Sequence, residues 1–122
     1  MKLTLETSDS NIISAWKDDA IRVGEEWHHG NVVVGTKHIV AGWTTSAAKD
    51  LTANDLRPAL DLTPEIVLLG TGRYLIRPGI DLMAELAERG LGLEIMDTAA
   101  ACRTYNVLIH EQREVVAALL FD

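Results

Sequence analysis

The chain has 122 residues, near the commonest size of one domain, so we expect a single domain over residues 1–122. It is 48% hydrophobic and 24% charged, which excludes wholesale disorder. A net charge of −7 gives no global attraction to nucleic acid or anionic lipid, and no apolar run is long enough to span a bilayer. We therefore expect neither nucleic-acid binding nor membrane insertion.

Two features of the sequence predict a cytoplasmic location. Cys102 is the one cysteine, so an intrachain disulfide is excluded and a reducing compartment is favoured. Residues 1–6 contain no long apolar run and reach an acid early, which does not fit a secretory signal or transit peptide.

Residues 1–43 are rich in short runs of β-branched or alternating residues, separated by Asp, Gly and Asn. This strand-rich part predicts an antiparallel meander. The strands are expected at residues 11–16, 20–24, 32–34 and 39–43.

Three histidines in this part invite a metal site. His28 and His29 are adjacent, so on a strand they would point to opposite faces and could not hold one ion together. No cysteine or carboxylate stands at zinc spacing from them. We expect these residues, with His38, at hairpin tips, and no metal.

Residues 52–63 carry a helix-start signal. Thr52 is a candidate N-cap, and Asp55 stands three residues later as in a capping box. Pro58 is unfavourable inside a long helix, so a short helix is expected.

From residue 64 to residue 122 the pattern predicts a strand–helix–strand–helix–strand (βαβαβ) unit. Residues 66–69 are a continuous apolar run, as expected for a strand covered on both faces. The elements that follow are expected at residues 78–89 (helix), 91–96 (strand), 98–110 (helix) and 115–120 (strand).

The first of these helices begins near Pro78 and ends before Gly90, a candidate C-cap. Its apolar stripe is predicted at Ile80, Met83, Ala84 and Ala87.

The second helix has capping residues and a divided surface. Asp97 and Thr98 offer N-cap chemistry, and Ala101, Tyr105 and Leu108 are expected to face the sheet. The polar stripe is either solvated, bonded to loop carbonyls, or part of a ligand site. It comprises Arg103, Asn106 and His110.

Several separated motifs of the second half resemble the Mth-type domain family of unknown function, which includes adipogenesis-associated and respiratory complex I assembly factor 3-like proteins. The motifs stand in the same order and spacing, whereas the first half matches more loosely, chiefly through Trp43, residues 51–52 and residues 64–65. They are residues 69–72, residues 94–108, Glu111, Arg113 and residues 115–119.

The resemblance implies a three-layer α/β fold. It has a mixed central sheet, the βαβαβ unit at the C-terminal end, flanking helices and additional strands from the first half. Family members are generally not known as enzymes, and one of them acts with a partner protein in assembling a membrane enzyme. The resemblance therefore implies a module that binds an as yet unidentified protein partner.

A glycine loop after the buried strand is the first part of a candidate ligand site. Glycines let the backbone approach a ligand, and free amides beside an arginine can hold an anion. The third glycine of a dinucleotide fingerprint and the Gly-Lys-Ser/Thr ending of a phosphate-binding loop are missing. A plain turn is therefore the alternative. The loop residues are Gly70, Thr71, Gly72 and Arg73.

The start of the second helix is the other part. Asp97 and Thr98 either cap this helix or form, with the glycine loop, a cleft for a small anionic ligand. Arg73 and Arg103 would hold the anion, and Asn106 is a further candidate. Asp97 would oppose an anion unless it is turned away or protonated.

Cys102 is expected to be a buried, inert thiol. His110 lies two turns away, about 12 Å along the helix, so it cannot activate the thiol directly. We expect no catalytic residue and no cofactor.

Two functions follow. The first is a non-enzymatic interaction or assembly-factor-type module, with a homo-oligomer as a further alternative. The second is a small-molecule or anion-binding protein, or an enzyme without a recognisable signature, whose cleft lies between residues 70–73 and the helix that starts near Thr98.

Overall fold

The computed structural model describes residues 9–121, so the expectation about residues 1–6 lies outside it. The strands are β1 (Ile13–Lys17), β2 (Ala20–Val23), β3 (Glu26–His29), β4 (Val32–Gly35), β5 (Ile39–Ala41), β6 (Ile66–Thr71), β7 (Gly92–Met96) and β8 (Val115–Leu120). The helical segments are η1 (Ala48–Asp50), α2 (Arg57–Leu60), α3 (Ile80–Glu88) and α4 (Thr98–His110).

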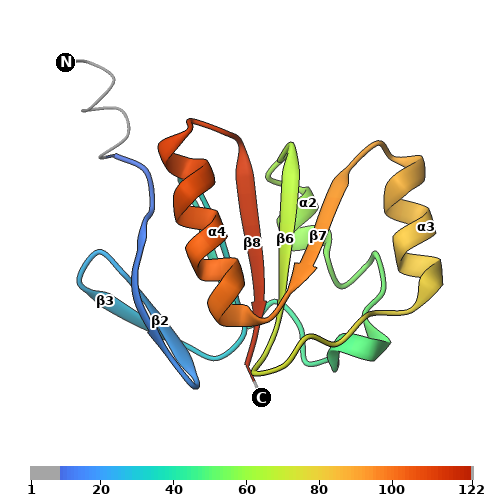
Figure 1. The fold of residues 1–122 in the computed structure, drawn as a ribbon, viewed down its shortest axis with the longest axis horizontal. Helices are drawn as coiled ribbons and strands as arrows, with labels where there is room; N and C mark the ends of the chain where they lie inside the picture. Colours follow the sequence, from blue (N-terminus) through green and yellow to red (C-terminus); the bar gives the residue numbers. More distant parts are fainter. Residues whose placement is uncertain (1–8, 122) are drawn as a thin grey trace.

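The predicted three-layer α/β class is confirmed. A five-stranded mixed sheet in the order β5-β4-β8-β6-β7 forms the middle layer (Figure 1). Strands β6, β7 and β8 are mutually parallel through the crossovers α3 and α4, as the βαβαβ prediction requires, whereas β4 and β5 run antiparallel. All six residues of β8 are buried, because helices or strands cover both faces of this central strand.

Each face of the sheet has its own hydrophobic core. On one face α4 packs together with the small sheet β1-β2-β3, and Tyr105 and Ile13 lie in this core. On the other face η1, α2 and α3 contribute apolar residues around Leu69 and Trp43. The Trp43 indole also donates a buried hydrogen bond to the Leu119 carbonyl at 3.0 Å, which ties the middle of the chain to the central strand.

The N-terminal meander is divided between the two sheets. Strands β1, β2 and β3 pair with one another, but β4 and β5 join the main sheet, where Val32, Val33 and Val34 are all buried. A strand buried on both faces needs a place inside a covered sheet, which the small sheet cannot provide.

The prediction of hairpin tips was wrong for two of the three histidines. His28 and His29 lie on β3, where they pair with Ile21 and Ala20 of β2. His38 does lie in the turn between β4 and β5, where its carbonyl accepts a hydrogen bond from the Gly35 amide at 2.8 Å.

The predicted capping box forms, although it closes a turn ahead of the one-turn helix α2. The Asp55 amide donates to the Thr52 hydroxyl at 3.2 Å, and the Thr52 amide donates to the Asp55 carboxylate at 2.9 Å. The same carboxylate accepts hydrogen bonds from Thr44 and Ser46. Burial raises the pKa of Asp55, but the hydrogen bonds together lower it by a larger amount. The pKa therefore lies below its ordinary value.

Replacement of Asp55 by alanine should therefore destabilise the fold by about 1–2 kcal/mol at pH 7, as loss of a cap and its hydrogen bonds typically does. Because the folded pKa is lowered, the stabilisation is complete above the unfolded pKa and is lost as pH falls through the folded value. Denaturant unfolding should thus show the difference at pH 7 and a smaller one near pH 3. The exposed Asp61→Ala variant should stay within about 0.5 kcal/mol of the parent at pH 7. A pH-independent difference would contradict this assignment.

The predicted apolar stripe of α3 was wrong. Leu82 and Leu86 are buried against the sheet, whereas Ile80 is 82% exposed. Two leucines one turn apart bury more apolar surface than the stripe with two alanines, so α3 turns the leucines inward. Ile80 is left in solvent at the first residue of α3.

Candidate functional site

The carboxyl ends of β6 and β8 meet the start of α4. Thr98 joins them, because its buried hydroxyl donates to the Leu120 carbonyl at 2.6 Å and accepts from the Gly72 amide at 2.8 Å. The Thr98 amide in turn donates to the Gly72 carbonyl at 2.9 Å. The glycine loop and the helix start therefore lie side by side, at the edge where parallel sheets commonly bind ligands.

Gly70 is required here by space. A Cβ atom at this position would lie 2.9 Å from the Thr98 Oγ1 and 3.0 Å from both the Thr98 Cα and a methyl of Leu119. Gly72 is required by conformation, because its φ of 101° is one that side chains disfavour. Both glycines thus serve the close junction between β6 and α4.

Thr71 orders the segment that follows. Its buried hydroxyl donates to the Tyr74 carbonyl at 2.6 Å and accepts from the Ile76 amide at 3.0 Å. The hydroxyl is thereby committed to internal hydrogen bonds, and the chain from Tyr74 to Ile76 is held in one conformation outside the sheet.

A cleft of about 290 Å³ lies beside this junction. Four of the eight candidate ligand-binding residues line it, namely Gly72, Arg73, Asp97 and Thr98. The rest of the wall comes from Ala99 and from segments that sequence reasoning did not connect with the site. These are the end of β1 with Asp18 of the β1–β2 turn, and Phe121. Gly70 and Thr71 lie behind this wall in β6.

The charges on the cleft wall are mixed. The Asp97 carboxylate caps α4 by accepting from the Ala100 amide at 2.8 Å, and Asp18 lies 3.7 Å from the Arg73 guanidinium. Lys17 is the further cation, and its ammonium lies 4.7 Å from the centre of the Trp27 ring. An anion in the cleft would lie beside two carboxylates, so the charge balance does not favour the anionic ligand considered from the sequence.

The two remaining candidates lie away from the cleft wall. Asn106 binds the backbone of β1 like a neighbouring strand, because its amide donates to the Ile13 carbonyl at 2.8 Å and its oxygen accepts from the Ile13 amide at 3.0 Å. Arg103 is exposed on α4. The polar stripe of this helix is therefore divided between an internal clamp and the surface.

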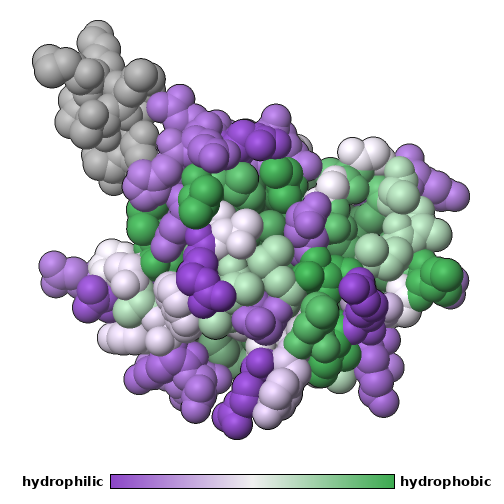
Figure 2. All heavy atoms as spheres, viewed as in Figure 1, coloured by the Kyte–Doolittle hydropathy of each residue, from purple (hydrophilic) through white to green (hydrophobic). Residues whose placement is uncertain are grey.

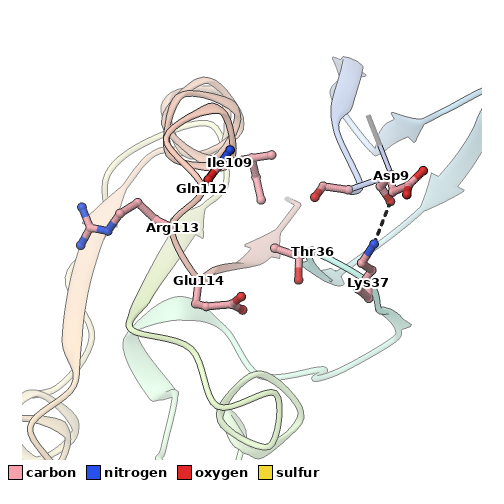
Figure 3. Close-up of a pocket in the computed structure, with 8 residues that line it drawn as sticks. Asp9, Thr36, Lys37, Ile109, Gln112, Arg113 and Glu114 are labelled. Carbon is pink, nitrogen blue, oxygen red and sulfur yellow. Dashed lines mark hydrogen bonds between the residues drawn. The ribbon is translucent and has the colours of Figure 1, made fainter. Parts of the chain in front are cut away.

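A second cavity, of about 310 Å³, lies at the opposite end of the sheet (Figure 3). It is formed where Asp9, the β4–β5 turn and the α4–β8 connection come together. Figure 3 shows the Lys37 amine directed toward Asp9 and the Arg113 guanidinium pointing away from the cavity. Arg113 is bonded to the Glu65 carboxylate at 3.2 Å. Its walls come from three distant parts of the chain, so the sequence offered no signal for it.

The single thiol is unreactive at neutral pH. Cys102 is fully buried, and burial raises its pKa to about 12 against the opposing effect of Arg103. Within residues 9–121, no group of three or more His, Cys, Asp or Glu side chains could hold a metal ion.

Sequence reasoning also missed the exposure of four apolar side chains, three between β6 and α3 and one at the first residue of α3. Tyr74, Leu75 and Ile76 are 69%, 50% and 41% exposed, and Ile80 follows at the first turn of α3. Figure 2 shows hydrophobic surface along this connection and near the start of α3. We call these four residues the apolar segment. An apolar triplet directly after the glycine turn, outside any expected helix or strand, was the available signal.

The fold and site define a small three-layer α/β domain whose βαβαβ unit is closed by the junction at Thr98. The chain belongs to the family described as a protein of unknown function (DUF498/DUF598), whose model matches residues 13–120. The resemblance to Mth-type domains is thereby confirmed. A solved Bordetella pertussis protein described as a Mth938-like domain has a TM-score of 0.77 and 30% identity, covering 90% of this chain and 85% of that one.

A crystal structure of a Bordetella parapertussis protein has a TM-score of 0.84 and 38% identity, covering 93% of this chain and 97% of that one. The human NADH dehydrogenase [ubiquinone] 1 alpha subcomplex assembly factor 3 is 35% identical over 98 residues, which are 75% of this chain and 53% of that protein. The chain thus spans about half the length of this relative. A Francisella tularensis protein named 13 kDa major membrane protein is 26% identical over 95 residues, 78% of this chain and 77% of that protein. In the described part of this chain, every helix is too short or too polar to cross a lipid bilayer.

Proposed function

We propose that this chain is a non-enzymatic interaction module of the assembly-factor type, which binds another protein through the apolar segment. The observation that carries the proposal is the exposure of Tyr74, Leu75, Ile76 and Ile80 on one short stretch of chain. Large apolar side chains exposed together on one short stretch of chain are typical of a binding site.

The conformation of the segment supports this role. The Thr71 hydroxyl bonds to the backbone carbonyl of Tyr74 and the backbone amide of Ile76, so the backbone that carries the apolar side chains is ordered before a partner arrives. A preorganised surface loses less conformational entropy on binding, which favours affinity. Tyrosine is also among the residues enriched in the parts of interfaces that contribute most to binding.

The candidate ligand site offers less support for the alternative. The candidate residues include Thr71, Thr98 and Asn106. The side chain of each one is hydrogen-bonded to backbone atoms elsewhere in the chain and not directed to a ligand. The human relative is named an assembly factor, which agrees with a module that acts by binding proteins.

The proposal includes a cytoplasmic location, and cell fractionation would test that part of it.

Quantitative affinity capture with three forms of the chain tests the function. The parent chain is compared with Leu75→Ser/Ile80→Ser and with Val107→Ser, a matched loss of an exposed apolar side chain on α4, where Val107 is 56% exposed. At least one protein should be recovered with the parent, fall about tenfold with the double variant, and be retained with Val107→Ser. Circular dichroism and thermal unfolding establish that all three forms are folded.

Equal recovery of the captured protein with the parent and with the double variant would show that the apolar segment is not part of the interface. Recovery of no protein in near-stoichiometric amount, combined with tight binding of a small molecule that the Asp97→Asn variant loses, would overturn the proposed function.

A further inference from the structure

The charge within residues 73–80 is opposite in sign to that of the whole chain. Residues 73–80 contain two arginines, Arg73 and Arg77, and no acidic residue, whereas the chain has a net charge of −7. Both arginines are exposed, and they stand on either side of Tyr74, Leu75 and Ile76. Along the chain, the segment therefore has an apolar centre with an arginine on each side. We call residues 73–80 the docking segment.

Resting on the function proposed above, we propose that the docking segment binds a short segment of a partner protein in which acidic residues flank apolar ones. Apolar side chains of the partner pack on Tyr74, Leu75 and Ile76, and its carboxylates meet the two guanidinium groups. Charge complementarity of this kind determines which partner binds and speeds the encounter.

The ion pair between Arg73 and Asp18 is compatible with this occupant. Its guanidinium lies 3.7 Å from the Asp18 carboxylate, and both side chains are largely in solvent. An exposed ion pair contributes little free energy, so a partner carboxylate can take the place of Asp18 beside Arg73 at small cost. Arg77 provides the second positive group at the other end of the triplet.

The surroundings favour a narrow peptide over an anionic membrane. Asp81 follows Ile80 directly, and Glu85 and Glu88 are also exposed along α3. A flat anionic surface that reached Ile80 would approach these acids, and a chain with a net charge of −7 is repelled by it as a whole. A peptide lying on residues 73–77 avoids α3, and charges farther than about 8 Å from it are screened at physiological salt.

Selection of random phage-displayed peptides on the purified chain tests this inference. The enriched sequences should combine Asp or Glu with Leu, Ile, Phe or Trp. Synthetic peptides made from them should bind about fivefold or more weakly to Arg77→Glu and should retain affinity for Arg77→Lys. The matched charge reversal Arg103→Glu, on exposed α4, should have a much smaller effect.

Enrichment of basic peptides, enrichment of none, or equal binding to Arg77→Glu would overturn the inference. Co-sedimentation with phosphatidylserine vesicles that Arg77→Glu abolishes would instead assign the segment to membranes. Dimerisation in sedimentation velocity that Leu75→Ser/Ile80→Ser abolishes would assign it to a second copy of this chain. If any of these occurs while capture of a protein still depends on Leu75 and Ile80, the proposed function survives without this partner chemistry. If capture does not depend on Leu75 and Ile80 either, both the proposed function and this partner chemistry are contradicted.

Discussion

Replacement of Gly70 by alanine is expected to lower the free energy of unfolding by about 2–3 kcal/mol, the usual cost of overfilling a packed site. The added Cβ would lie 2.9 Å from the Thr98 Oγ1 and 3.0 Å from the Thr98 Cα. Neither atom can easily withdraw, because Thr98 is bonded to both Leu120 and Gly72. The methyl group would thus separate α4 from β6.

Denaturant unfolding measures this effect, and Gly92→Ala is the matched control. A Cβ at Gly92 would meet only the Glu65 carbonyl, at the ordinary contact distance of 3.8 Å. That control should be neutral or stabilising by up to about 1 kcal/mol, since alanine restricts the unfolded chain. If Gly70→Ala matched Gly92→Ala, the junction would be looser than the hydrogen bonds of Thr98 indicate.

Replacement of Asn106 by alanine should destabilise the chain by about 2–4 kcal/mol. The variant removes two hydrogen bonds and leaves the amide and carbonyl of the buried Ile13 without these partners. Asn106 links α4 to β1, so the small N-terminal sheet should loosen before the main sheet does. Tyr105, which donates to the Asn11 carbonyl at 2.8 Å, remains as a second link.

Amide hydrogen exchange separates this local effect from global unfolding. Protection in β1 and β2 should fall more than protection in β6 and β8. Arg103→Ala, an exposed change on the same helix, should alter stability by no more than about 0.5 kcal/mol. Uniform loss of protection across both sheets would show that Asn106 supports the whole fold instead of the attachment of β1.

Thr98 and Asn106 explain why residues 94–108, the longest of the motifs that carry the family resemblance, are a poor guide to chemistry. Residues 94–108 include Thr98 and Asn106, and each of them joins α4 to a distant strand. The sequence pattern of this segment therefore reports how the layers are assembled. The exposed apolar segment lies outside it and is the better candidate for function.

Local patterns in the sequence were enough to determine the βαβαβ unit, because each of its elements has its own signal. The apolar run at Ile66, the capping residue Asp97 and the closing run from Val115 each act over a few neighbouring residues. The capping box at Thr52 is local in the same sense, and it formed even though α2 begins later.

Only the tertiary structure decided which side chains of a helix are buried, because that choice depends on segments that are distant in the sequence. Whether α3 buries Ile80 or its two leucines depends on the sheet beneath the helix, and whether Asn106 is solvated depends on β1, which lies 93 positions away in sequence. The same holds for the cleft, whose wall includes the β1–β2 turn. Periodicity identifies which residues of an element can be buried together, but the free energy gained by each choice depends on the surface that the rest of the chain presents.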